Sequence, residues 1–373
     1  MISRRTVLLP DGESELALRV LRCLSQVPGL SVCALSREPR GPIRFSRHLA
    51  GFESHSVDEF DRERLDTIKA AAETFKADII LPVEIPSSKL LADHREEVER
   101  IAAVPPLSSS ELFDGVSDKW RFAQFLERKE IPHPKTVYVG HGESVEERLS
   151  ELRFPILVKP RRASGGHGIR RFESLPAALQ WASDRRDIDD MLFQEFIQGE
   201  LIDCNILSKG GDILAHTIQR ALVQGRSPYK PPAGFEFVDD ERALAITEKV
   251  IRGLEYSGVA NFDLIYDQER GEMKVLEMNP RYWMSLLGSL VAGVNFPGLS
   301  CLLSEGRPFT RPEYRHVRYV RPEASIGLLA GRYLGKSSPI SSLHQTGLPF
   351  VFRDPLPELT IMFSRPTKTG FAP

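Results

Sequence analysis

The feature that most restricts the fold is a pair of alternating segments, residues 259–266 and 272–278, around a polar turn that ends in Gly271. Successive side chains of a strand point to opposite faces, so this pattern predicts a β-hairpin with one apolar and one polar face. The residues expected on the apolar face are Phe262, Leu264, Tyr266, Leu276 and Met278.

The register of this hairpin brings two carboxylates together. With the turn centred on Arg270, Asp263 lies directly opposite Glu277, and Asn261 and Asn279 form the next pair on the same face. Opposed residues have β-carbons only about 4.5–5.5 Å apart, so their carboxylates repel unless a cation lies between them. Mg²⁺ binds carboxylate and carbonyl oxygens, and the pattern therefore indicates a magnesium site. The alternative is an exposed strand face, where acidic residues are common.

Positively charged residues follow two of the predicted strands. Lys159 ends an apolar run, and the loop after it, residues 161–171, contains three glycines. Glycines let a backbone approach a phosphate closely, and its bare N–H groups can cradle the oxygens. The lysine precedes the glycines, unlike in a Walker A loop, and an ordinary surface loop is the alternative. Arg281 follows the hairpin, where a guanidinium could steady developing phosphoryl charge or lie on the surface.

The first hundred residues alternate between short apolar runs and amphipathic stretches. Strands that alternate with helices predict a doubly wound parallel sheet, and two prolines at 105 and 106 mark its end. The glycine fingerprint of a dinucleotide-binding turn is absent after the first strand. The expected elements are strands at 6–10, 31–36 and 78–83 and helices at 14–26 and 62–75.

The rest of the chain predicts an α+β arrangement. Residues 331–337 resemble a P-loop, but too few residues separate the glycines and no strand precedes them, so a P-loop is rejected. Helices are expected at 118–129, 239–253 and 324–334, strands at 136–139, 156–158 and 191–197, and a hairpin at 203–208 and 213–221 that turns at Gly210-Gly211.

Composition limits the class of protein. A length of 373 residues predicts two or three domains. The formal net charge of −2 gives no bulk attraction to nucleic acid or a membrane surface, so neither is expected as a partner. No apolar run reaches the roughly 18 residues that span a bilayer. The four cysteines are widely scattered and predict buried, reduced thiols in a cytoplasmic protein.

Four segments occur in a fixed order. They are Lys119 before a helix that ends in Ile-Pro-x-Pro, a Val-Lys-Pro strand end with its glycine loop, the run Gln-Glu-Phe-Ile, and Glu-x-Asn-Pro-Arg. Together they resemble the ATP-grasp superfamily, in its carbamoyl-phosphate-synthetase and biotin-carboxylase-like branch. The resemblance implies a mixed α/β and α+β fold with four parts: an N-terminal Rossmann-like pre-ATP-grasp domain (1–106), ATP-grasp subdomains A (107–193) and B (194–310), and a C-terminal extension (311–373).

The resemblance also implies a role for each matching residue. Lys119 and Lys159 match the lysines that hold the nucleotide phosphates, and the flap over these phosphates matches Ser164, Gly165, Gly166, His167 and Gly168. The strand that meets adenine matches Glu195, Phe196 and Ile197, with Asp203, or else Glu200, at the ribose. The magnesium ligands match Asp263, Glu277 and Asn279, and the catalytic pair is Arg281 and Lys159.

The function that the resemblance implies is a ligase that uses ATP and Mg²⁺, or Mn²⁺ in its place. Such an enzyme activates a carboxylate as an acyl phosphate and couples it to an amine, so small-molecule carboxylates and amines are the expected partners. A biotin-carrier motif and a glutaminase domain are absent, and Asp263 stands where biotin carboxylases often have glutamate, which favours a stand-alone ligase. Arg220, before the expected substrate loop 223–232, could bind a carboxylate, although a surface role is favoured. Carboxylation, thioester formation and an inactive nucleotide-binding regulator stay open, and a homodimer rests on the resemblance alone.

Overall fold

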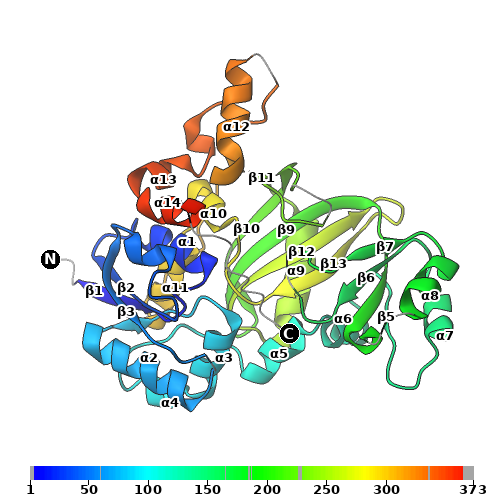
Figure 1. The fold of residues 1–373 in the computed structure, drawn as a ribbon, viewed down its shortest axis with the longest axis horizontal. Helices are drawn as coiled ribbons and strands as arrows, with labels where there is room; N and C mark the ends of the chain where they lie inside the picture. The colour runs from blue at the N-terminus through cyan, green and yellow to red at the C-terminus, as the bar shows by residue number, and fades with distance from the viewer. Residues whose placement is uncertain are drawn as a thin grey trace.

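The computed structural model describes residues 4–58, 60–163, 165–183, 185, 187–225, 229–334 and 337–363. Figure 1 shows an α/β unit built from the N-terminal part of the chain, beside two sheets formed by its middle part. A helical extension formed by the C-terminal part projects at the top of the view.

The N-terminal unit is a parallel sheet covered by helices on both faces, as predicted. Its strand order is β3-β2-β1-β4, and its core lies partly on the side of α1 and partly on the side of α2 and α3. Because both faces are covered, the strands are apolar along most of their length. The elements are β1 (Arg5–Leu9), α1 (Glu15–Leu24), β2 (Leu30–Ser36), the 3-10 helix η1 (Pro42–Phe45), β3 (Leu49–Ser54), α2 (Arg62–Phe75), β4 (Ile79–Ile80), α3 (Ile85–Asp93) and α4 (Arg95–Val98).

Side-chain caps set where several of these elements begin. Ser14 and Asp61 accept hydrogen bonds from the first-turn amides of α1 and α2, which fixes both starts close to the predicted residues. The strand predicted at 78–83 is wrong in length, since β4 ends at Ile80. The buried carboxylate of Asp11 accepts the amide of Val83 at 2.8 Å and that of Glu84 at 3.2 Å, and these bonds draw the chain out of the sheet into α3.

The next unit is a four-stranded sheet of order β5-β8-β6-β7 in which the paired strands are antiparallel. Its apolar face packs against two short helices. Two helices precede it, and Asp118 both ends the first and caps the second. The elements are α5 (Ser110–Ser117), α6 (Lys119–Arg128), β5 (Thr136–Tyr138), α7 (Val145–Ser150), β6 (Ile156–Pro160), β7 (Arg170–Phe172), α8 (Leu175–Ser183), the 3-10 helix η2 (Ile188–Asp190) and β8 (Met191–Glu195).

A six-stranded antiparallel sheet of order β13-β12-β9-β10-β11-β14 completes the centre. Helix α9 covers one face, and α10 and α11 pack on the other face together with α1. The predicted hairpin turn at Gly210-Gly211 is confirmed, with φ of 57° and 87° at the two glycines. The elements are β9 (Gly199–Lys209), β10 (Asp212–Val223), β11 (Gly234–Phe237), α9 (Glu241–Leu254), β12 (Gly258–Asp267), β13 (Glu272–Asn279), α10 (Leu286–Ala292), α11 (Phe296–Ser304) and β14 (Arg318–Val320).

The C-terminal extension is mainly helical and contacts both the six-stranded sheet and the N-terminal unit. It comprises α12 (Pro322–Tyr333), the 3-10 helix η3 (Leu343–Gln345), α13 (Leu348–Arg353) and α14 (Leu356–Phe363). Its strand β14 joins the six-stranded sheet, and α14 packs against η1 of the N-terminal unit. The three boundaries between the four predicted parts stay predictions.

Among the described residues, no single helix is long and apolar enough to cross a membrane. Helices α10 and α11 pass that test of length and composition only as a pair, and the chain bends by 88° between them.

The carboxyl group of Asp11 links the stability of the N-terminal unit to pH. Burial, helped by Glu13, raises the pKa of Asp11 to about 7. The folded state therefore holds this proton more tightly than the unfolded chain, whose Asp pKa is about 4, and the free energy of unfolding falls as pH rises from about 4 to about 7. Asp11→Asn keeps an acceptor without a charge. We expect the variant to gain stability relative to wild type over this range, by at most about 4 kcal/mol.

Urea unfolding at a series of pH values measures this difference. Asp93→Asn, at an exposed position at the end of α3, is the matched control and should keep the pH dependence of wild type. Parallel curves for wild type and Asp11→Asn would contradict the prediction.

Candidate active site

One face of the six-stranded sheet carries a row of acidic side chains. The predicted pairs Asp263 with Glu277 and Asn261 with Asn279 are both confirmed by the observed register. Asp203 on β9 lies opposite Asp263, and Gln219 on β10 lies opposite Asp203. Three carboxylates thus lie side by side on adjacent strands. In order, the row is Gln219, Asp203, Asp263 and Glu277.

A second row, two residues along each strand, consists of uncharged polar groups. Asn205 donates to Thr217 at 3.3 Å and accepts from Asn261 at 3.0 Å. Asn279 donates to Asn261 at 3.4 Å and to the Glu277 carboxylate at 3.2 Å. Each amide orients the next, so the row forms a hydrogen-bonded floor beside the carboxylates.

The electrostatics of the acidic row are uneven. Burial, together with Glu277 and Asp203, raises the pKa of Asp263 well above its usual range, and burial raises the pKa of Asp203 to about 6. Burial also acts to raise the pKa of Glu277, but Lys119, a hydrogen bond with Asp263, and Lys159 outweigh it and hold the pKa at about 2. Glu277 therefore has positive neighbours, whereas Asp203 and Asp263 lack a full countercharge.

The residues of this row fit a divalent cation that is shared with another molecule. Asp263 and Glu277 supply hard oxygen donors, and the amide of Asn279 lies beside Glu277. Within the described parts of the chain, no three His, Cys, Asp or Glu side chains form a metal-binding cluster. Protein groups alone would leave such an ion incompletely coordinated, and Mg²⁺ commonly completes its shell with phosphates and water.

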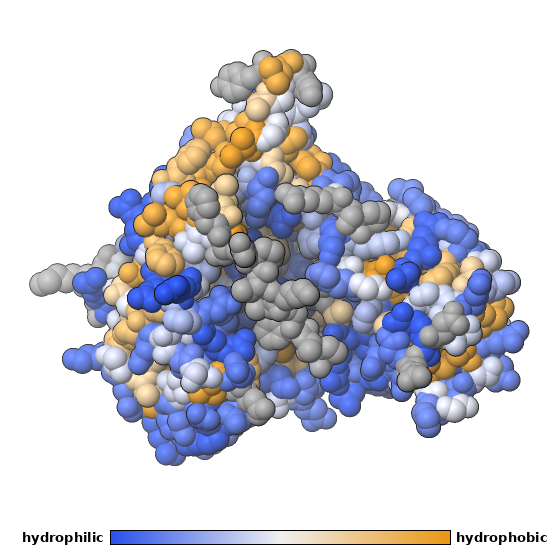
Figure 2. Space-filling view, viewed as in Figure 1, coloured by the Kyte–Doolittle hydropathy of each residue, from blue (hydrophilic) through white to orange (hydrophobic). Residues whose placement is uncertain are grey.

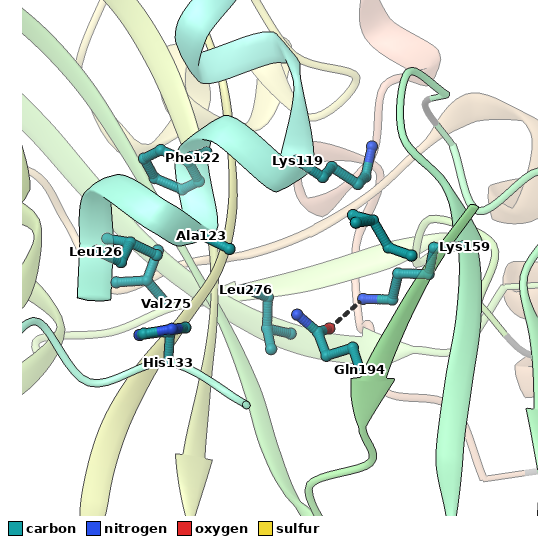
Figure 3. A pocket seen from close by; sticks show the side chains of 10 residues that line it. Lys119, Phe122, Ala123, Leu126, His133, Lys159, Gln194, Val275 and Leu276 are labelled. Carbon is teal, nitrogen blue, oxygen red and sulfur yellow. Dashed lines mark hydrogen bonds between the residues drawn. The ribbon is translucent and has the colours of Figure 1, made fainter. Parts of the chain in front are cut away.

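The two predicted lysines approach the row from other elements. The Nζ of Lys159, at the end of β6, donates to the Gln194 side chain at 2.7 Å. The Nζ of Lys119, at the start of α6, donates to the carbonyl of Ala163 at 2.5 Å and lies 3.5 Å from the Glu277 carboxylate. Burial lowers the pKa of Lys159, against the pull of Glu277. Figure 3 shows both lysines on one side of a pocket whose other side is lined by apolar side chains and His133.

On strand β8, Gln194 and not Glu195 faces this pocket. Gln194 lines the pocket and bridges Lys159 and the hydroxyl of Thr136 (Figure 3). Glu195 lies on the opposite face, where its carboxylate accepts the backbone amide of Arg153 at 2.9 Å. The next residue, Phe196, packs its ring under Arg171. The structure therefore adds Gln194, which the sequence analysis missed, to the candidate residues.

A β-bulge moves one predicted core residue into the same pocket. Between Asp263 and Leu264 the register shifts, so that Val275 rather than Leu276 lies opposite Leu264. Val275 and Met278 are buried in the core, and Val275 also borders the pocket, whereas Leu276 lines the pocket and is not part of the core. The expectation that Leu276 faces the core is wrong, because the extra residue reverses the alternation.

The glycine loop has the backbone that its composition predicts. Gly165, Gly166 and Gly168 have φ of 64°, 69° and 75°, which favour glycine, and His167 is exposed between them. Ser164 lies outside the described residues. The buried Asp118, also missed in the sequence analysis, accepts from Arg161 at 2.6 Å and so ties the start of the loop to the cap of α6.

The glycine loop lies against the loop between β10 and β11. A β-carbon on Gly166 would be 1.8 Å from the carbonyl oxygen of Tyr229, so only glycine fits there. Lys230 donates to the carbonyl of Gly165 at 3.3 Å. The predicted flap and the predicted substrate loop are therefore in contact, although residues 226–228 lie outside the described residues.

Two arginines differ in position. Arg281, directly after β13, donates to the carbonyl of Tyr282 and lies 4.0 Å from the Glu84 carboxylate, which brings the N-terminal unit to the edge of the site. Arg220 is on the opposite sheet face, paired with Glu236 at 2.8 Å and Glu200 at 3.5 Å. This exposed cluster favours the surface role for Arg220. Glu200 belongs to the cluster and so lies on the face opposite the two polar rows.

Comparison with known proteins agrees with this geometry. The family model of the ATP-grasp domain matches residues 116–285. This segment is an ATP-grasp domain. It contains both lysines, the glycine loop, the acidic row and Arg281.

Curated relatives resemble the chain at low identity. D-aspartate ligase of Enterococcus faecium is 24% identical over 247 residues, which cover 60% of this chain and 57% of the ligase. The carbamoyl phosphate synthase large chain of Clostridium perfringens is 30% identical over 237 residues, covering 59% of this chain and 22% of the synthase. The matched region thus spans little more than half of the first protein and less than a quarter of the second.

Solved structures share the fold beyond the ATP-grasp domain. N5-carboxyaminoimidazole synthetase of Staphylococcus aureus has a TM-score of 0.67 at 13% identity and covers 90% of this chain and 87% of its own. The biotin carboxylase domain of 2-oxoglutarate carboxylase from Hydrogenobacter thermophilus has a TM-score of 0.66 at 17% identity, covering 85% and 73%. The N-terminal unit and both sheets therefore share the fold of these two solved structures.

The contrast between Gln194 and Glu195 can be tested by nucleotide binding. Gln194→Leu removes the side chain that orients Lys159, and we expect the affinity of the ATP-grasp domain for Mg·ATP to fall about tenfold, the effect of one lost hydrogen bond to a charged group. Glu195→Gln is the matched neighbour and should bind nearly as wild type. Titration calorimetry measures both, and a larger loss for Glu195→Gln would restore the assignment implied by the resemblance.

The contact between the two loops gives a second prediction. Gly166→Ala places a methyl group against the Tyr229 carbonyl, so the loops cannot adopt this arrangement, and we expect weaker Mg·ATP binding with little change in melting temperature. Gly142→Ala is the control, because Gly142 has φ of 82° but no atom within 4 Å of an added β-carbon. Equal affinities of the two variants would show that the loop contact is not needed for binding.

Proposed function

We propose that this chain is an ATP- and Mg²⁺-dependent ligase that activates a carboxylate as an acyl phosphate and couples it to an amine. The observation that carries the proposal is the acidic row of the ATP-grasp domain, with Lys119 and Lys159 above it. Hard oxygen donors beside two ammonium groups suit a polyphosphate that is held together with a metal ion.

The similar structures support the choice of nucleotide. The Staphylococcus aureus synthetase is in complex with ADP, and the Hydrogenobacter domain is in complex with MgADP, ADP and bicarbonate. On the present chain, Asp263, Glu277 and Asn279 would hold the magnesium ion. When bound there, the ion would neutralise phosphate oxygens and hold them in line for transfer.

The residues of the chain then supply positioning and charge. Lys159 and Lys119 hold the phosphates while an oxygen of the substrate carboxylate forms a bond to the γ-phosphorus and the bond from that phosphorus to ADP breaks. Arg281 steadies the charge that spreads over the transferred group. The amine nitrogen then attacks the acyl carbon, phosphate leaves and the nitrogen loses a proton. The glycine loop excludes water from the acyl phosphate, and no side chain acts as a nucleophile.

The flanking elements set the substrates of the proposed reaction. Glu84 reaches Arg281 from the N-terminal unit, and the β10–β11 loop lies against the glycine loop. Both segments therefore border the position of the reacting groups. A homodimer stays a prediction.

Trapping the acyl phosphate with hydroxylamine tests the proposal. The protein is incubated with ATP, Mg²⁺, hydroxylamine and pools of carboxylates, and we expect carboxylate-dependent ADP and a hydroxamate. Release of AMP would overturn the acyl phosphate in favour of adenylation. ADP that depends on bicarbonate, without a hydroxamate of an organic acid, would indicate carboxylation instead.

Substitution of one proposed metal ligand tests the role of the acidic row in the reaction. Asp263→Asn should lower turnover by about 10² or more, the scale of lost transition-state charge stabilisation, and weaken Mg·ATP binding. Asp212→Asn, at the exposed start of β10, is the matched control and should be unaffected. If Asp263→Asn binds Mg·ATP as well as wild type and no carboxylate pool supports turnover, the regulator is the better description.

A further inference from the structure

The outer surface of the C-terminal extension is apolar to an unusual degree. Eight of its large apolar side chains are between 44% and 77% exposed, and Figure 2 shows a hydrophobic area over α12, α13 and α14. Exposed apolar areas of this extent mark binding surfaces. The exposed residues are Ile326 and Leu334 at α12, Leu343 in η3, Phe352 in α13, and Leu356, Leu359, Ile361 and Met362 in α14.

The N-terminal unit continues this surface. Helix α14 packs against η1, whose Phe45 is also exposed. Arg44 in η1 and Arg47, two residues after the end of η1, are exposed. The Arg47 side chain donates to the carbonyl of Arg353 at the end of α13. We call the surface formed by Phe45, Arg44, Arg47, Arg353 and the exposed residues of α13 and α14 the basic apolar patch.

The acidic residues of the extension helices all pair with the N-terminal unit. Asp354 is buried and accepts from Ser46 at 2.6 Å and from the Arg47 amide at 2.9 Å. Glu358 pairs with the buried Arg22 at 2.8 Å. Glu323 of α12 lies 3.8 Å from Arg19. The outer surface of these helices therefore carries arginine and apolar side chains. Among their described residues, no acid is left unpaired there.

We propose that the basic apolar patch binds the surface of an anionic lipid bilayer. Short helices with exposed apolar side chains can enter the interface between headgroups and acyl chains, and nearby arginines add attraction to anionic lipids. The net charge of −2 for the whole chain conceals this patch, because the paired acids lie on its inner side.

Charge decides between a bilayer and a second copy of the chain. Two patches facing each other would bring Arg44, Arg47 and Arg353 of both copies together with no acid in the patch to pair with them, and like charges oppose association. Residues 364–373 also carry Arg365 and Lys368 but no acid, so their charge does not favour covering the patch. An anionic surface complements it.

Bilayer binding is compatible with the candidate active site. None of the patch residues belongs to the acidic row, the two lysines or the glycine loop. The proposal is independent of the reaction, so it can hold or fail separately.

Vesicle flotation with the full chain tests the proposal. We expect the protein to float with vesicles of phosphatidylcholine mixed with phosphatidylglycerol, and not with phosphatidylcholine alone. Added salt should reduce binding, because it screens the arginines. The variant Arg44→Glu with Arg353→Glu should lower the bound fraction at least fivefold, and so should Leu356→Ser with Met362→Ser. Both variants should keep the wild-type melting temperature and Mg·ATP affinity.

The control is Arg252→Glu, which reverses an exposed charge on α9, away from the patch. Its binding should equal that of wild type. Equal flotation of wild type and the double-charge variant would overturn the proposal, as would binding that ignores phosphatidylglycerol. A dimer in solution that the patch variants dissociate, without flotation of wild type, would assign the patch to a second copy instead.

Discussion

The register of strands β9, β12 and β13 is the constraint on which the site depends. It places Asp203, Asp263 and Glu277 side by side, an arrangement that costs stability when each acid carries its charge. The opposite face of the same strands holds the register, since Phe262, Leu264 and Met278 are buried beneath α9. A slip of one residue would exchange these faces and bury the carboxylates in the core. Hydrophobic packing on one side thus forces like charges together on the other.

The lysines at the four-stranded sheet compensate only part of the repulsion between these carboxylates. Lys119 and Lys159 reach Glu277 from α6 and β6 and keep it ionised, while Asp203 and Asp263 retain raised pKa values. The site therefore has a surplus of lysine charge at one end and of carboxylate charge at the other. A polyphosphate with a divalent cation carries the complementary pair of charges. The gap between the sheets is suited to that pair more than to either ion alone.

Local features of the fold could be predicted because local residues determine them. Asp61 begins α2 within one turn of the chain, and the hairpin register follows from one turn and two alternating segments. The bulge beside Asp263 was missed, although two consecutive apolar residues, Val275 and Leu276, interrupt the alternation of β13 at that point. It left Asp263 and Glu277 in place but turned Leu276 from the core towards the pocket.

The rest of the site depends on pairings between distant segments. Nothing near Asp203 indicates that β9 pairs with β12, and so its place beside Asp263 needed the structure. Gln219 belongs to the predicted hairpin, but a register shift between Ile213 and Ala215 sets its pairing with Asp203. The choice between Gln194 and Glu195 depends on the pairing of β6 and β8, which no turn fixes.

Charge balance over the whole chain is a poor guide to its surfaces for the same reason. Ion pairing between distant segments decides which charges remain outside. The Arg22 side chain pairs with Glu358, and the backbone amide of Arg47 donates to Asp354, at the junction of the extension and the N-terminal unit. More than 300 positions separate the two residues of each contact. These contacts turn Asp354, directly after α13, and Glu358 of α14 towards the N-terminal unit. They thereby fix which side of these helices faces outward. On the inner side of α13, Leu348 is buried and Phe350 packs against the core. Phe352 of α13 and Leu356, Leu359, Ile361 and Met362 of α14 stay on the outer side, so the polar contacts that attach these helices leave the extension with a hydrophobic outer face.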